Sequence, residues 1–243
     1  MTWSLLAVDG SGALGVAIAS RFFAVGALCP GVLAGRGALS SQALMNPLYR
    51  AAGLEALGRG AEPAEILRLL TGLDDGRDVR QLHILDAAGR SAAHTGAACI
   101  EWCGHLAGPG FSVAGNMLAG SRVIEDTARA YEAGSALPFA ERLLTAMDAG
   151  ERAGGDKRGR QGAALVIHTT EEYPSLDLRV DDHVEPLAEL RRLYGVSLER
   201  FQPFMQCLPT HSNPKGITDR MAIEAHIAKF QTQRRGQPPR GQD

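Results

Sequence analysis

The sequence predicts an α+β protein built in layers, because its expected strands and helices come in groups rather than in strict alternation. The clearest pattern lies at the start, where apolar runs at residues 3–8 and 13–19 flank Asp9-Gly10-Ser11-Gly12. Asp-Gly between two β-prone runs is a strong hairpin signal, because glycine tolerates the positive φ of tight turns. Neither run alternates between apolar and polar residues, which is typical of strands covered on both faces.

Apolar spacing and turn residues extend this prediction along the chain. A second short hairpin is expected over residues 31–37 and 38–41, around Gly35-Arg36-Gly37. The other expected elements are helices over 42–58 and 63–72, a hairpin over 79–86 and 90–95, a strand over 111–114, helices over 122–133 and 138–152, strands over 163–168 and 176–180, and a helix over 184–194. Pro47 falls in the first turns of its helix, where a missing N–H costs little.

The end of the chain differs in composition. Residues 201–243 are rich in Gln, Pro, Arg and Gly, so we expect a layered domain over residues 1–200 and a polar C-terminal extension over residues 201–243. Ile223, Ile227 and Phe230 have helical spacing and predict one helix over residues 218–230. From Gln231 onward the composition predicts no fixed structure.

Composition excludes several functional classes. The 243 residues are 45% hydrophobic, 21% charged and 5% aromatic, with a net charge of −2. A nucleic-acid partner is not expected, because phosphate binding needs a basic surface and base stacking needs aromatic residues. Neither a membrane span nor a secretory signal is expected, which predicts a cytoplasmic protein. The four cysteines are then expected as free thiols.

Several stretches resemble a known family. They are residues 2–26 with their hairpin, 19–26, 115–120, 154–161 and 176–183. Together they make residues 2 to about 195 similar to an uncharacterised bacterial and archaeal family, domain of unknown function 1028, whose fold is that of the N-terminal-nucleophile (Ntn) hydrolases such as proteasome β-subunits. The resemblance implies a four-layer αββα sandwich, with two antiparallel sheets between helix layers. It implies no particular reaction.

Thr2 is the first candidate for catalysis. If Met1 is removed, one residue carries both a hydroxyl and a free α-amine, and a terminal amine titrates near neutral pH. The resemblance makes Thr2 the nucleophile of an Ntn hydrolase. The alternative is that Thr2 is simply the small residue that follows an initiator methionine.

Six further residues are candidates for the same site. Asn116 and Asp156 resemble supporting residues of proteasome subunits, and Asn116 is expected either to orient the nucleophile or to donate to an oxyanion. Ser41 is expected at a strand-to-helix junction, where it serves an oxyanion or simply caps the helix. The list of expected substrate-binding residues is Arg21, Arg36, Ser41 and Arg158. Each of the six has a plain structural alternative: a residue at a strand end, a residue in a turn, a helix cap, or a charge in solvent.

The chain departs from the proteasome pattern in one respect. Its three lysines are Lys157, Lys215 and Lys229, so the lysine that proteasome-type hydrolases place on an early strand is absent. Arg36 is a candidate to replace that charge, but an arginine does not shuttle protons because it stays protonated.

No metal and no cofactor are predicted. Cys99, Cys103 and His105 lack the spacing and the fourth ligand of a zinc site. Asp181-Asp182-His183 is more typical of a plain strand end, and Gly108-Pro109-Gly110 lacks the lysine of a phosphate loop.

We therefore predict an amidohydrolase for a small peptide-like or acyl-amide substrate, with a carboxylate that the arginines bind. One alternative is a non-catalytic Ntn-fold scaffold that binds a small acidic molecule or forms a homo-oligomer. A weaker alternative is a serine hydrolase that uses Ser40 or Ser41, although the first 82 residues contain no histidine.

Overall fold

The structure is a computed structural model that describes residues 2–235. It divides into two compact units, residues 1–191 and residues 192–243. None of the helices within residues 2–235 combines the length and the apolar character that crossing a bilayer requires.

Two antiparallel sheets form the centre of the N-terminal unit. The larger has the strand order β10-β9-β2-β1-β8-β7 and the smaller the order β3-β4-β5-β6. The strands are β1 (Thr2–Val8), β2 (Leu14–Ser20), β3 (Pro30–Leu33), β4 (Gly37–Ala43), β5 (Arg80–Asp86), β6 (Ser91–Thr95), β7 (Trp102–Gly108), β8 (Phe111–Leu118), β9 (Gly162–His168) and β10 (Leu176–Val180).

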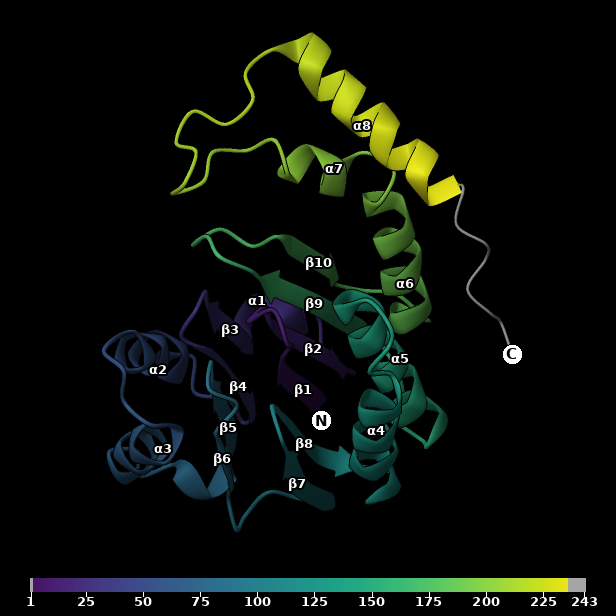
Figure 1. The fold of residues 1–243 in the computed structure, drawn as a ribbon. Coiled ribbons are helices and arrows are strands. Elements are labelled where there is room, and N and C mark those ends of the chain that lie inside the picture. The colour runs from purple at the N-terminus through teal and green to yellow at the C-terminus, as the bar shows by residue number, and fades with distance from the viewer. Residues whose placement is uncertain (1, 236–243) are drawn as a thin grey trace. The chain divides into compact units, whose positions relative to one another are not determined.

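Helices cover the outer face of each sheet. Figure 1 shows α2 and α3 against the smaller sheet and α4 and α5 against the larger one. The helices of this unit are α1 (Val25–Leu28), α2 (Leu48–Gly58), α3 (Pro63–Gly72), the 3₁₀ turn η1 (Arg77–Val79), α4 (Arg122–Ala133), α5 (Phe139–Arg152) and α6 (Pro186–Ser197), which continues into the second unit. The predicted α+β class, with two antiparallel sheets between helix layers, is confirmed.

The central hairpin shows how side chains that point alternately to the two faces of a sheet build these layers. All of β2, and β1 up to Ala7, are buried, because side chains on one face meet helices and those on the other meet the smaller sheet. Trp3 lies against Gly150 of α5. Leu6 of β1 packs with Val16, Ala38 and Leu85 in a cluster between the two sheets. Thr2 and Ser4 share the face of Leu6 because strand side chains alternate.

The helix predicted to begin at residue 42 begins at Leu48, so that prediction is wrong at its start. Residues 40–42 belong to β4 and pair with β5. Pro47 occupies the N-cap with φ −63°, and the residue before a proline is disfavoured in helical conformation. Asn46 therefore separates strand from helix.

Other bounds also differ from the sequence prediction. β7 was not predicted, because this edge strand is only partly buried and contains Gly104 and Gly108. β8 continues from Ala114 to Leu118, and α6 ends three residues later than expected. In the C-terminal unit, α7 (Phe201–Met205) packs against α8 (Arg220–Arg235). Residues 231–235 are therefore helical rather than without structure, and residues 236–243 lie outside the described part.

Candidate functional site

A cavity of about 450 Å³ opens at the end of the sheets where β1 begins. Its polar wall contains Thr2, Asn116 and Arg158, and its apolar wall contains Leu44, Met45 and Ile100. Leu44 is 66% and Ile100 60% exposed, so the apolar wall reaches the surface. Pockets of this volume with apolar walls and a few polar groups are typical of small-molecule sites.

Backbone strain gathers around this cavity. Ala43 (φ 66°) and Met117 (φ 52°) line it in the left-handed region, and Glu101 (φ 58°) follows Ile100 of its wall. Residues other than glycine adopt this conformation at an energetic cost, and such residues cluster at binding and catalytic sites. The strain marks the cavity as a candidate site by a route independent of Thr2.

Thr2 lies at the start of β1 with its side chain on the cavity wall. It pairs with Asn116 of β8 in the sheet register, and its hydroxyl Oγ1 donates to Ser20 Oγ at 3.0 Å. The residue is 5% exposed. The fold thus places a largely buried hydroxyl at the edge of the cavity.

Asn116 is held by two hydrogen bonds from its amide nitrogen. Nδ2 donates to the carbonyl oxygen of Thr2 at 3.3 Å and to Oε1 of Gln81 at 3.0 Å. The hydrogen bond to Thr2 suits the predicted role of orienting that residue. The two hydrogen bonds together contradict the alternative role of Asn116 as an oxyanion donor, because both of its N–H groups already have acceptors inside the protein.

Arg21, Asp156 and Arg158 form one cluster beside the cavity. The Asp156 carboxylate is 1% exposed and accepts from the Arg21 and Arg158 backbone N–H groups at 2.7 and 2.9 Å. It also accepts from the Arg158 guanidinium at 3.4 Å, and the Arg21 guanidinium donates to the Arg158 carbonyl oxygen. Asp156 therefore positions two arginines, and among the described residues it forms no hydrogen bond with the Thr2 hydroxyl. Arg158 lies on the cavity wall. Arg21 does not line the cavity, but its carbonyl oxygen accepts a hydrogen bond from the Arg158 guanidinium.

Arg36 and Ser41 do not belong to the cavity wall. Arg36 lies in the turn before β4, at the opposite end of that seven-residue strand, which puts it about 20 Å from the cavity end. It therefore cannot replace the missing lysine. The Ser41 hydroxyl donates to the Asn46 carbonyl oxygen and accepts from the Asn46 N–H. Since β4 continues past Ser41, the expected helix N-terminus is absent there.

The sequence prediction missed a polar layer buried between the two sheets. It consists of Ser4, Gln42, Gln81, His83 and Ser112, each with no exposed surface. Burial, with a smaller effect from the charge of His105, lowers the pKa of His83 from 6.5 to about 3. The available signal was polar residues at alternate positions in apolar strands, such as Gln81 and His83.

The buried histidine does not support a serine hydrolase. His83 pairs with Ser40 across β4 and β5, but its ring bonds to Ser4 at 2.8 Å and Ser112 at 3.0 Å. The Ser40 hydroxyl donates to Gln42. Because Ser40, Ser4 and His83 are fully buried, a substrate does not reach them.

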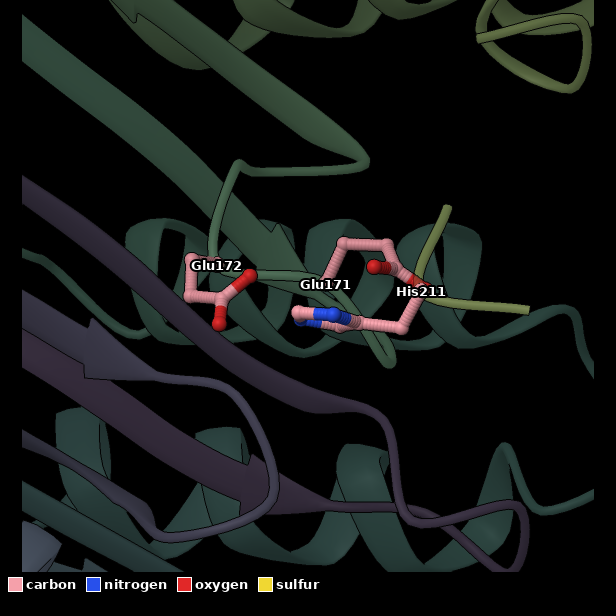
Figure 2. A group of neighbouring side chains, drawn as sticks. All are labelled: Glu171, Glu172 and His211. Carbon is pink, nitrogen blue, oxygen red and sulfur yellow. The ribbon is translucent and has the colours of Figure 1, made fainter. Parts of the chain in front are cut away.

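The side chains of the cysteine–histidine motif each contact a different group. Cys99 Sγ contacts the Arg80 carbonyl oxygen, Cys103 Sγ that of Cys99, and His105 Nδ1 the Thr95 hydroxyl. Figure 2 draws Glu171 and Glu172, on the loop that joins β9 to β10, together with His211 of the C-terminal unit. Two acidic residues on a loop do not by themselves make a metal site, and we assign none across the two units.

Comparison with known proteins agrees with the extent of the N-terminal unit. The model of a "Family of unknown function (DUF1028)" matches residues 2–190. Among solved structures, the chain is similar to protein SPO2555 from Silicibacter pomeroyi, described with the same family: identity is 30%, the TM-score is 0.83, and the match covers 90% of this chain and 96% of that one.

Anbu (ancestral beta-subunit) from Yersinia bercovieri also matches, with 13% identity, a TM-score of 0.38, and coverage of 81% of this chain and 94% of that one. No curated protein matches the chain. The family model and the likeness to SPO2555 together show that this chain belongs to the DUF1028 family.

Proposed function

We propose that the protein is an N-terminal-nucleophile amidohydrolase whose active site is the cavity beside Thr2. The observation that supports this best is the position of Thr2 as the first residue of β1, with its side chain on the wall of that cavity. A nucleophile at the very start of a buried central strand brings its own α-amine to the reaction. The mechanism therefore requires a chain from which Met1 has been lost.

In the proposed reaction, the Thr2 hydroxyl attacks the carbonyl carbon of the substrate amide, and the Thr2 α-amine takes the hydroxyl proton. The tetrahedral intermediate collapses when the C–N bond breaks and that proton passes to the leaving amine. Water, deprotonated by the same α-amine, then cleaves the acyl–threonine ester and restores the hydroxyl. Asn116 holds the Thr2 carbonyl oxygen throughout.

The wall of the cavity suits a small substrate with a carboxylate and an apolar group. Arg21, Arg158 and Asp156 together carry one net positive charge, and Arg158 lies on the wall. Guanidinium groups bind carboxylates by paired hydrogen bonds. Leu44, Met45 and Ile100 then provide contacts for an apolar side chain.

The α-amine is the base that this site offers. Among the described residues of the cavity wall there is neither a histidine nor a lysine. An α-amine has an ordinary pKa of about 7.7–8.0, so turnover should rise with pH through this range.

That same absence of a side-chain base favours one alternative. A protein that keeps Met1 has no free α-amine at Thr2, and the cavity then binds an apolar carboxylate without cleaving it. Loss of Met1 distinguishes the two functions.

The test is a panel of N-acyl amino acids, assayed for release of the free amino acid. We expect Thr2→Ala to abolish turnover and Thr2→Ser to retain part of it. Arg158→Met should raise KM for carboxylate-bearing substrates at least tenfold, since a charge-assisted hydrogen bond contributes about 1.5–3 kcal/mol. Arg36→Met is the matched control and should leave KM unchanged. Normal turnover by Thr2→Ala would contradict the proposal.

A further inference from the structure

The orientation of Gln81 is determined by the main chain. Its Nε2 lies 3.1 Å from the Gly104 carbonyl oxygen and 2.9 Å from that of Gly115. Carbonyl oxygens only accept, so the nitrogen end of the side-chain amide must face them. Oε1 consequently points the other way, toward the nitrogen atoms of Gln42 at 2.8 Å and Asn116 at 3.0 Å.

Gln42 is oriented in the same way. Its Nε2 donates to the Ala114 carbonyl oxygen at 3.1 Å and to Gln81, so its Oε1 must accept. The Ser4 hydroxyl, 2.7 Å away, therefore donates to Gln42 Oε1. Since the only proton of Ser4 is then in use, the Ser4 oxygen accepts from Nε2–H of His83, and the Ser112 hydroxyl donates to Nδ1.

This chain of donors and acceptors runs in one direction from Ser112 to Gln81. Reversing any one amide would oppose two oxygens or two N–H groups at several buried positions, each at a substantial cost. His83 is thereby assigned as the neutral Nε2–H tautomer. The polar layer therefore fixes the orientation of the Asn116 side chain, which lies at its edge.

Asn116 donates both of its side-chain N–H groups, one to Gln81 Oε1 and one to the Thr2 carbonyl oxygen. Its Oδ1 faces away from these two acceptors. Within residues 2–235 no side chain or backbone group donates to that oxygen, and Asn116 lines the cavity. The cavity wall therefore presents a carbonyl acceptor at this position, and Arg158 lies on the wall of the same cavity.

We infer that Gln81 is a positioning residue that holds Asn116 Oδ1 toward the cavity, so that the site selects a ligand that donates an N–H there. The ligand class is an N-acyl amino acid: its secondary amide N–H meets Asn116, and its carboxylate meets Arg158. This inference deepens the proposed function because it rests on the same cavity. It does not depend on Thr2 as the nucleophile.

Two probes that differ at one atom test this selection. N-acetyl-L-leucine carries the N–H, and 2-acetoxy-4-methylpentanoate has an ester oxygen in its place. Affinities are measured by calorimetry in the Thr2→Ala variant, in which neither probe is cleaved by the proposed mechanism. We expect the amide to bind at least about tenfold more tightly, since the ester leaves the acceptor unpaired and faces it with an oxygen.

Variants separate the hydrogen bond from general effects on the cavity. Asn116→Leu, in the same background, should bring the affinity ratio to about one. Ile100→Val is the matched control and should change both affinities together, which leaves the ratio intact. Equal affinity for the two probes in Thr2→Ala, or no binding of either at millimolar concentration, would overturn the assignment of the ligand.

The positioning role has its own measurement in the ligand-free protein. Hydrogen exchange followed by NMR should show slow exchange for both side-chain N–H protons of Asn116. Gln81→Leu should accelerate it while the backbone spectrum of the folded protein persists. If that variant does not fold, the wild-type rate decides: exchange as fast as in an exposed asparagine would refute the orientation. Turnover without preference for the amide refutes this inference alone, and preference without turnover in the wild type refutes only the proposed function.

Discussion

Acidification should destabilise this protein through His83. The ring is fully buried between the two sheets, and burial lowers its pKa from 6.5 to about 3. In the unfolded chain the same ring takes up a proton as the pH falls below about 6.5, whereas in the folded protein it stays neutral down to about pH 3. The unfolded state therefore binds more protons across this interval, and the free energy of unfolding falls as the pH falls.

The size of the effect follows from the shift. Each pH unit within the interval removes about 1.4 kcal/mol from the free energy of unfolding. At about pH 4.5, two units below the ordinary histidine value, the loss is about 2.7 kcal/mol, against a typical total stability of 5–15 kcal/mol. This contribution is fully present above pH 6.5 and is lost progressively below it.

The assay is urea denaturation at intervals between pH 7 and pH 4, followed by tryptophan fluorescence, for which the buried Trp3 is a suitable probe. His83→Gln keeps a donor and an acceptor at the position but removes the titrating ring, so its stability should depend less on pH. His183→Gln, at an exposed histidine, is the matched control and should behave as the wild type. Burial also lowers the pKa of His168, which adds to the slope in all three proteins. Equal slopes in the wild type and His83→Gln would refute the argument.

Two further predictions concern glycine packing and thiol reactivity. Gly96→Ala should cost about 1–3 kcal/mol in urea denaturation, because its Cβ would lie 2.3 Å from the Asp78 carbonyl oxygen; a neutral result would contradict the backbone contact. Gly72→Ala, the control in α3 with open space around it, should instead stabilise by up to about 1 kcal/mol. Burial raises the pKa of Cys29 to about 12, so iodoacetamide at about pH 8 should alkylate Cys99 and Cys103 first, as read by peptide mass mapping. Earlier labelling of Cys29 in the native protein would show that it is accessible.

Local patterns predicted much of the fold. The hairpin at Asp9-Gly10, helix α3 and strand β10 follow from turn residues and apolar spacing, and the structure places them within a residue or two of the expected bounds. These elements are defined by neighbours in the chain, which a sequence displays directly. The start of α2 failed because a buried strand and an apolar helix face look alike over a few residues.

The site was less accessible to the same reasoning. Asn116 and Arg158 on the cavity wall came from the family resemblance rather than from local pattern. Arg36 was misplaced because the sequence does not show at which end of the sheets the cavity opens. Arg36 lies before the first residue of β4, and the cavity lies at the last. Ser4, Gln42 and Gln81 meet from three strands far apart in the chain, so their hydrogen bonds exist only once the register of both sheets is known.

The most direct test of the central claim is the intact mass of the purified, active protein, together with a peptide map of its N-terminus. We expect the molecules that turn over substrate to lack Met1 and to begin at Thr2, with a free α-amine. Addition of an acyl-amide substrate followed by rapid acid quenching should then show a mass increase of one acyl group on the N-terminal peptide. A protein that hydrolyses amides while retaining Met1, or an acyl group found on any other residue, would contradict the account.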